Sequence, residues 1–341
     1  MRAAELIAPL TFRLTDMPIG DPGPGEVQVR VEAVGICGSD LHAYAEGAVG
    51  STPNAYPMVL GHEPAGTIVK TGPGVTGLAP GDRGALEPAL YCYHCEFCLR
   101  GLHNLCANIR FLSTPPDPGF FREWVNLPVA NFLPVPADLS AEQATLIEPL
   151  AVALHSLSLA SIRPAETVAV IGAGPIGLLT IAALRAAKAG RIWAVEPVTH
   201  RRALARAMGA DTALEPAEAE GEILRSTGQR GVDCVFDCAA GEGTTGQAIR
   251  VTCHAGRVLV TGIHSIPFIP MDGSAMRRKQ LTIISVRRSN HESSAALELL
   301  QAHPDWFAPL LTHAREMEQI AEAFVIASQY QDGVGKMIVR P

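Results

Sequence analysis

Thr167-Val-Ala-Val-Ile-Gly-Ala-Gly-Pro-Ile-Gly177 joins a continuous apolar run to a glycine-rich turn. The apolar run, Thr167 to Ile171, is typical of a strand that is buried on both faces of a parallel sheet. The residues after the turn are rich in alanine and leucine and predict a helix that extends to Lys188. A strand, a glycine turn and a helix in this order predict one unit of a doubly wound α/β sheet.

The glycine spacing within this unit predicts a dinucleotide site. Gly172 makes the turn, Gly174 lets the backbone approach a pyrophosphate, and Gly177 allows helix and strand to pack closely. The helix opens at Pro175 and Ile176, and a helix N-terminus favours an anion. The motif follows a strand and opens a helix, as a dinucleotide fingerprint requires.

The next strand indicates which dinucleotide is preferred. A second strand is expected at 191–195 and ends at Glu196, about twenty residues after the motif, where an acid bonds the ribose 2′-hydroxyl. A 2′-phosphate would meet the charge of this carboxylate, which favours NAD over NADP. Arg201 and Arg202 are the counter-evidence, because an arginine nearby can accept a phosphate. The acid at the strand end carries more weight, and we expect NAD, with Arg201 among the binding residues.

The rest of the second half continues the alternation of strands and helices that a parallel sheet requires. Strands are expected at 232–237, 257–260 and 281–286, amphipathic helices at 292–302 and 317–328, and a last strand at 336–339 that returns to the N-terminal β domain.

The N-terminal part has the pattern of a β domain. Val27, Val29 and Val31 alternate with polar residues over 26–34, which predicts a half-buried strand. Further short strands are expected at 64–70 and 83–87, between glycine- and proline-rich turns. Short strands separated by turns indicate a partly closed β-barrel.

Four side chains around these strands form a candidate metal site. His62 and Glu63 are adjacent, Cys37 follows the strand 26–34, and Glu148 lies far downstream in an apolar run. One thiolate, one imidazole and one or two carboxylates can hold a zinc ion with a position left open for catalysis. Alternatively, Cys37 is a buried apolar thiol and Glu148 an exposed cap; the company of His62 and Glu63 favours the metal.

Glu148 is expected at a break between two helices. Ser140 and Gln143 form a capping-box signature for a helix over 140–147. Pro149 is expected to interrupt that helix, which restarts over 150–159.

Four cysteines form a second candidate metal site. The spacing Cys-x2-Cys-x2-Cys-x7-Cys suits a closed tetrahedral zinc site, whose role is structural because no ligand position is open. Chance clustering or disulfides are the alternative. The expected ligands are Cys92, Cys95, Cys98 and Cys106.

Composition excludes several classes of function. The net charge of −7 and the absence of a basic block argue against nucleic acid as a partner. The apolar fraction of 48% and charged fraction of 18% argue against disorder. The N-terminus lacks the apolar core of a signal peptide, and the glycines at 172–177 interrupt the one long apolar stretch. We therefore expect a cytoplasmic protein, with its 8 cysteines reduced and no membrane segment.

The chain resembles the zinc-dependent medium-chain dehydrogenase/reductase family, within the alcohol dehydrogenase superfamily, and its sorbitol (polyol) dehydrogenase branch. The resemblance covers essentially the whole length. It rests on the segments Gly35–His42, Pro57–Glu63, Gly81–Arg83, Thr114–Asp117, Glu148–Val152 and Gly172–Gly177.

The resemblance implies the domain layout. A GroES-like zinc-binding catalytic domain would span 1–150, with a structural-zinc lobe at 89–108. A Rossmann dinucleotide-binding domain would span 151–287, and residues 288–341 would return to the catalytic domain. Dimers and tetramers are usual in the family, so a homo-oligomer, such as a homotetramer, is expected.

The resemblance also implies roles for the residues around the catalytic zinc. Cys37 and His62 would bind the ion directly, and Glu148 would take the place of a second cysteine. Glu63 would bind the metal or hold its water, depending on state. Ser39 would pass the proton of the alcohol on toward His42, and Asp40 would orient His62.

The substrate is implied only as a class. Arg288 matches an arginine that holds polyol hydroxyls, and Phe111 matches a pocket aromatic. Ser289 and Ala43 stand where the polyol branch often has aromatic residues, so the pocket is expected to differ. We expect NAD-dependent oxidation of a secondary alcohol of a polyol, cyclitol or sugar alcohol to a ketone.

Other readings stay open at this stage. On the same scaffold the substrate could be 2,3-butanediol or L-threonine. From other classes of protein, the alternatives are a non-catalytic nucleotide-binding or regulatory protein and a zinc-free reductase of alkenes or quinones. The presence of all four candidate ligands argues against both.

Overall fold

The computed structural model describes all residues from Met1 to Pro341, and the chain divides into two compact units. The first comprises Met1–Pro149, Ser293–Gln301 and Leu311–Pro341, and the second comprises Leu150–Glu292 and Ala302–Leu310. Each unit has its own sheets and its own hydrophobic core, which is what a domain requires.

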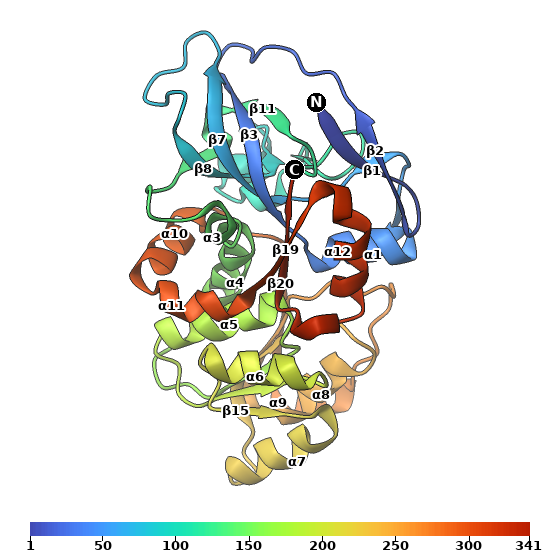
Figure 1. The fold of residues 1–341 in the computed structure, drawn as a ribbon. Coiled ribbons are helices and arrows are strands. Elements are labelled where there is room, and N and C mark those ends of the chain that lie inside the picture. The colour runs from blue at the N-terminus through green and yellow to red at the C-terminus, as the bar shows by residue number, and fades with distance from the viewer. The chain divides into compact units, whose positions relative to one another are not determined.

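The main sheet of the first unit is built on one long strand, β3 (Glu26–Gly35). Its antiparallel partners are β7 (Glu63–Thr71), β11 (Trp124–Pro128) and β20 (Lys336–Arg340). The sheet continues through β8 (Arg83–Leu86), β12 (Phe132–Pro134) and β19 (Leu311–Glu316). The last strand, red in Figure 1, therefore joins the sheet that contains the blue strand β3, as the sequence predicted.

Small sheets complete the first unit. They are β2 (Thr11–Asp16) with β1 (Arg2–Ala8) and β6 (Met58–Val59), β4 (Ala48–Val49) with β5 (Thr52–Pro53), and β9 (Ala89–Leu90) with β10 (Arg110–Phe111).

The valines of β3 lie in the core as their alternation predicted, but the other face is less exposed than expected. Val27, Val29 and Val31 are at most 2% exposed. Gln28, predicted to face outward, is buried as well, because its amide donates to the Gly20 carbonyl and to Asn126, both at 3.0 Å. The side chain is thus buried with its polar atoms paired, as buried amides must be.

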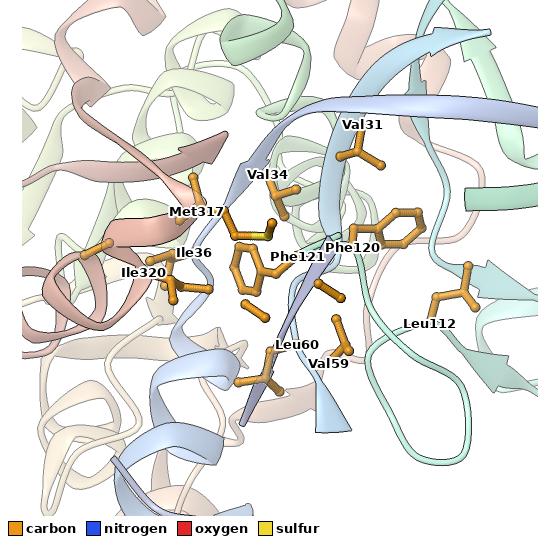
Figure 2. Packing of buried hydrophobic residues seen from close by; sticks show 14 of the residues in the cluster. Val31, Val34, Ile36, Val59, Leu60, Leu112, Phe120, Phe121, Met317 and Ile320 are labelled. Carbon is orange, nitrogen blue, oxygen red and sulfur yellow. The ribbon is translucent and has the colours of Figure 1, made fainter. Parts of the chain in front are cut away.

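The core of the first unit combines residues from both ends of the chain. Figure 2 shows Phe121 among Val34, Ile36, Met317 and Ile320, which belong to one cluster of buried residues. Phe121 and its neighbour Phe120 are fully buried. Burial of side chains of this size stabilises each by about 1.5–3 kcal/mol. This packing fixes the C-terminal segment against β3.

The two helices around Glu148 have different bounds from those predicted. The capping box of Ser140 and Gln143 is present, but its helix, α3, is only Ala141–Ala144. The long helix, α4, runs from Ile147 to Ala160, so the break lies before Glu148. The prediction that Pro149 interrupts a helix was wrong. Pro149 lies in the first turn of α4, where its missing N–H would have no partner within the helix.

The second unit is a parallel six-stranded sheet with the order β15-β14-β13-β16-β17-β18, which confirms the doubly wound prediction. The strands are β13 (Val168–Ile171), β14 (Ile192–Val195), β15 (Thr212–Leu214), β16 (Val232–Asp237), β17 (Thr252–Val260) and β18 (Thr282–Ser285). The helices between the strands are α5 (Pro175–Ala186), α6 (Thr199–Ala207), α7 (Pro216–Ser226), α8 (Thr244–Val251) and α9 (Gly273–Lys279). The strand order reverses between β13 and β16, where such sheets bind ligands.

The last helices are α10 (Ser293–Ala302), α11 (Pro304–Phe307) and α12 (Ile320–Ser328). None of the helices in the structure combines the length and the apolar character needed to cross a bilayer.

Candidate metal centre and dinucleotide site

The end of β3 and the start of β7 bring the candidate metal ligands together. Gly35, the last residue of β3, pairs with Glu63, the first residue of β7. Cys37 follows two residues later and caps helix α1 (Gly38–Glu46). The antiparallel ladder therefore places the thiol opposite the His62-Glu63 pair, although about twenty-five residues separate them in the sequence.

Three of the predicted donors converge. The ligand atoms of Cys37, His62 and Glu63 all lie within 4.8 Å of one another. His62 is 7% exposed and Glu63 is 1% exposed. Oε1 of Glu63 is buried without a hydrogen-bond partner, which is costly unless a cation or donor approaches it. One thiolate, one imidazole and one carboxylate are a donor set that zinc accepts.

Asp40 fixes the imidazole of His62. Its Oδ1 lies 3.3 Å from Nδ1 of His62, and the carboxylate accepts the backbone N–H of Cys37 at 3.0 Å and of Gly61 at 3.2 Å. Burial acts to raise the pKa of Asp40, but His62 and these bonds outweigh it and the pKa is lowered. The carboxylate thus holds Nδ1 and leaves Nε2 for a metal, the arrangement that orients many ligating histidines.

The charges around His62 link metal binding to the release of a proton. Burial lowers the pKa of His62, yet the charges of Asp40 and Cys37 outweigh it and hold the pKa well above 6.5. A ligating imidazole must be neutral, so a metal ion displaces this proton when it binds.

Lys336 is a residue of this site that the sequence analysis missed. It is 1% exposed, forms an ion pair with Oε2 of Glu63, and donates from Nζ to the Ile36 carbonyl at 2.9 Å. A Cβ at Gly35 would lie 2.7 Å from Cε of Lys336, so only glycine leaves room for the pair. The sequence signal was a lysine that opens strand β20 and is followed by three apolar residues.

Glu148 is close enough to His62, Glu63 and Lys336 for their charges to act on it. Its carboxylate is not among the ligand atoms that lie within 4.8 Å of one another, which belong to Cys37, His62 and Glu63. Burial raises the pKa of Glu148 to about 7; the charge of His62 opposes this rise, while those of Glu63 and Glu87 add to it. Direct ligation by Glu148 stays a prediction. Glu87, which the sequence analysis did not single out, is a further carboxylate whose charge acts on Glu148, and it accepts from the Ser293 hydroxyl.

Two other predicted residues, Ser39 and Phe111, lie beside His62, and a third, His42, lies on the same helix as Ser39. The hydroxyl of Ser39 lies 3.4 Å from Nε2 of His62, and the ring of Phe111 lies 5.4 Å from the imidazole, centroid to centroid. His42 lies on α1 three residues after Ser39, and its Nδ1 is 2.8 Å from Oε1 of Glu46. Residues three apart share a helix face, so Ser39 and His42 lead from the metal centre toward the surface.

The four clustered cysteines come together as a second metal site. All four sulfur atoms lie within 4.8 Å of one another. The sulfur of Cys92 lies 4.0 Å from that of Cys98, and the sulfur of Cys106 lies 4.0 Å from that of Cys95 and 3.5 Å from that of Cys92. A tetrahedral zinc with Zn–S bonds of about 2.3 Å places its sulfurs about 3.8 Å apart. The sulfur atoms therefore already have the spacing of a zinc–thiolate site.

Backbone and amide donors prepare one of these thiols for a metal. Backbone N–H donation at Cys92, from His94 first and also from Cys95, lowers its pKa to about 5, and the Asn108 amide, 3.6 Å away, adds to this. Donors of this kind favour the thiolate, which is the form that binds zinc.

The dinucleotide fingerprint has the predicted geometry. Gly172 directly follows β13 and has φ +91°, and Gly177 packs so closely on the Gly172 carbonyl that no side chain fits there. Gly174 precedes α5, with Pro175 and Ile176 in the first turn. The first glycine turns the chain and the third lets helix and strand pack, as the motif requires.

Glu196 is held against this turn. It is 4% exposed, and its carboxylate accepts the N–H of Ala173 at 2.7 Å and of Val198 at 3.0 Å. Nη1 of Arg202 donates to the carbonyls of Glu196 and Pro197, so this arginine is occupied by the main chain.

Arg201 approaches the fingerprint. Its Nη1 would lie 3.9 Å from a Cβ at Gly174.

Arg288 lies in the second unit after β18, with φ +56°. Ala43 is 1% exposed and packs in the core of the first unit, so the expectation that it alters a pocket gains no support here.

Comparison with known proteins agrees with this geometry. Residues 23–137 match the alcohol dehydrogenase GroES-like domain, and residues 175–302 match the zinc-binding dehydrogenase family. Sorbitol dehydrogenase of Bacillus subtilis (strain 168) is 32% identical over 343 residues, which cover 100% of this chain and 97% of the relative.

Solved structures give the same result. The crystal structure of 2R,3R-butanediol dehydrogenase from Bacillus subtilis superposes with a TM-score of 0.89 at 30% identity, over 100% of this chain and 99% of that one. A zinc-binding dehydrogenase from Sinorhizobium meliloti 1021, bound to NADP, has a TM-score of 0.90 at 28% identity, with 100% and 99% covered.

The two matched domains and the full-length similarity confirm the resemblance and the fold class predicted from the sequence. The chain has a four-cysteine structural zinc site and a Cys/His/Glu site of catalytic type. This protein belongs to the zinc-containing medium-chain alcohol dehydrogenase superfamily, and it is a zinc-dependent alcohol or polyol dehydrogenase.

Proposed function

We propose that this enzyme oxidises a secondary alcohol of a polyol, cyclitol or sugar alcohol to the ketone, with NAD⁺ as the hydride acceptor. The observation that carries the proposal is the convergence of the Cys37, His62 and Glu63 ligand atoms within 4.8 Å. This donor set suits a zinc site with an open position rather than a closed structural one.

The residues of the first unit would hold the metal and manage the proton. Zinc bound by Cys37 and His62, with Glu148 as the third protein ligand and Glu63 as a ligand in one state, would supply the Lewis acidity that lowers the pKa of the alcohol. Asp40, through its contact with Nδ1 of His62, would leave Nε2 to bind the ion.

Ser39 and His42 would carry the proton away. The Ser39 hydroxyl is 3.4 Å from Nε2 of His62, the nitrogen that would bind the metal. The His42 side chain is 31% exposed and bonds to Glu46, so it would release to solvent a proton that Ser39 passes on. A hydroxyl that can both accept and donate is suited to passing the proton on.

The second unit supports NAD⁺ over NADP⁺. The dinucleotide would supply the hydride acceptor, with its pyrophosphate at the N-terminus of α5. The buried Glu196 carboxylate lies at the end of β14, where a 2′-phosphate would be repelled. Arg202, which could offset this repulsion, is engaged by the Glu196 and Pro197 carbonyls and by Glu215.

The substrate class rests on the similarity to polyol dehydrogenases and on two side chains. Phe111 packs beside His62 and would form a pocket wall, and Arg288 would hold hydroxyl groups. The structural similarity to 2R,3R-butanediol dehydrogenase favours a vicinal diol as the second candidate, and a hydroxy-amino acid such as L-threonine stays in the test panel.

A screen for NADH release tests the proposal. Purified zinc-loaded enzyme is offered sugar alcohols, cyclitols, butanediol isomers and L-threonine, each with NAD⁺ and with NADP⁺. We expect turnover with at least one polyol or diol and a higher kcat/KM for NAD⁺. Exclusive turnover of threonine would contradict the substrate class, and preference for NADP⁺ would contradict the assignment of Glu196.

A further inference from the structure

Asp237 is a buried carboxylate at the point where the strand order of the second unit reverses. It ends β16 and pairs with Ile171, the last residue of β13, on one side and with Val260 on the other. It is 0% exposed. The crevice outside the carboxyl ends of β13 and β16 is where a doubly wound sheet binds its ligand.

Four donors from the following segment surround this carboxylate, and no lysine, arginine or histidine donates to it. Oδ1 accepts the backbone N–H groups of Ala239 at 3.2 Å and Ala240 at 3.1 Å. Oδ2 accepts the hydroxyls of Thr244 at 2.9 Å and Thr245 at 2.7 Å. The two oxygens therefore hold a turn and the first residues of α8 together. Buried charge is tolerated only with such pairing.

The turn that Asp237 holds packs directly on the fingerprint. A Cβ at Gly172 would lie 2.8 Å from the Ala239 nitrogen and 2.9 Å from its Cα. The N–H of Cys238, which starts the turn, donates to the Ile171 carbonyl at 2.8 Å. The position of Ala239 thus sets how far the Gly172 turn can move.

The same turn also positions the loop after β17. A Cβ at Gly262 would lie 2.7 Å from Cβ of Ala240, and the N–H groups of Thr261 and Gly262 donate to the Asp237 carbonyl at 2.9 and 3.0 Å. Segments after three strands, β13, β16 and β17, therefore meet around one residue.

We propose that Asp237 is a positioning residue for the dinucleotide: it holds the 238–241 turn against Gly172 and so preorganises the crevice into which the fingerprint binds its ligand. This inference rests on the proposed dinucleotide binding. It assigns Asp237 no contact with the reacting atoms. Preorganisation of this kind lowers the cost of ordering a site when its ligand binds.

Asp237→Asn is the direct test, because asparagine keeps the size and removes one acceptor. Its amide would turn N–H donors toward either the two backbone N–H groups or the two threonine hydroxyls. We expect the Kd for NADH, measured by fluorescence titration, to rise about tenfold. The KM for the dinucleotide should rise with it, whereas kcat should change much less.

Asp233→Asn is the matched control. Asp233 lies near the other end of the same strand and accepts from the N–H and hydroxyl of Thr167 at 2.9 and 2.7 Å. Its substitution should lower the melting temperature and leave the Kd for NADH unchanged. A Kd that rises equally in both variants would show a merely structural effect and overturn the proposal.

A second pair of variants decides the question if Asp237→Asn does not fold. Thr245→Val removes one donor at constant size, while Thr245→Ser keeps it. We expect a weaker affinity for NADH in Thr245→Val only, and equal affinities would overturn the proposal. If the wild-type enzyme binds neither NADH nor NADPH, the proposed function itself fails. Wild-type binding with an unchanged Kd in Asp237→Asn overturns only the role of Asp237.

Discussion

Lys336 and Glu63 form a buried ion pair that joins the last strand of the chain to the strand that begins at the metal centre. Both side chains are 1% exposed. Nζ of Lys336 also donates to the carbonyl of Ile36, the neighbour of Cys37. One ammonium therefore contacts both segments that carry candidate metal ligands, and it balances the charge of Glu63.

Lys336→Met should destabilise the protein mainly when zinc has been removed. Loss of one partner from a buried pair costs about 3–5 kcal/mol, because the remaining charge is unbalanced. A zinc ion would neutralise Glu63 in its place, so the loss should be smaller in the zinc-loaded protein. Denaturant unfolding with and without a chelator measures both values.

Lys336→Arg provides the comparison, since it keeps the charge in a larger side chain. It should unfold with a smaller dependence on zinc than Lys336→Met. An equal loss of stability in zinc-loaded and zinc-free Lys336→Met would contradict the idea that metal and lysine share Glu63.

The pKa of Glu148 predicts a pH-dependent stability of the zinc-free protein. A carboxyl with an ordinary pKa of 4.5 and a folded pKa of about 7 binds more protons in the folded state between these values. Its contribution to stability is therefore present below about pH 4.5 and is lost as the pH rises to 7.

Glu148→Gln should remove this dependence. At pH 8 the zinc-free variant should be more stable than the zinc-free wild type by on the order of 2 kcal/mol, and the difference should vanish toward pH 5. Unfolding curves at a series of pH values test this. A constant difference across the series would mean that Glu148 is not held in a neutral state.

Much of the fold followed from the sequence because its patterns are local. The strand 232–237 was placed at its observed bounds by the alternation of strands and helices, and the fingerprint at 172–177 by its glycines. The helix around Glu148 was misplaced, because a proline in a first turn and a proline at a break have the same local pattern.

The metal centre was only partly predictable for a different reason. Cys37, His62 and Glu63 follow or precede strands, and their chemistry identifies them. Lys336 is 273 positions from Glu63, and a lysine at the start of a strand normally faces solvent. In the sheet β20 lies between β3 and β19, and pairing with strands so distant in the chain cannot be read from the local sequence.

The four-cysteine lobe should be an independent metal site. Cys106→Ser should remove one zinc ion per chain and make the segment between Cys92 and Cys106 sensitive to proteases, because the metal supplies much of its folding energy. Metal analysis and limited proteolysis check both effects. Cys253→Ser, a buried thiol outside the lobe, is the control and should retain both ions. Loss of both ions in Cys106→Ser would show that the two sites are not independent.

Glu196→Ala should weaken the preference for NAD⁺ over NADP⁺ by about tenfold in the ratio of kcat/KM values, because a charged acceptor for the ribose hydroxyl is lost together with the repulsion of a 2′-phosphate. Glu220→Ala, which removes an exposed partner of Arg250, is the control and should keep the wild-type ratio. An unchanged ratio in Glu196→Ala would remove the basis for expecting NAD.

The zinc content and turnover of Cys37→Ala test the central claim most directly. The wild-type enzyme should hold two zinc ions per chain, one at each cluster. We predict that Cys37→Ala retains one ion and NADH binding but loses alcohol oxidation. Two zinc ions together with full NAD⁺-dependent turnover in this variant would contradict the assignment of the catalytic metal centre.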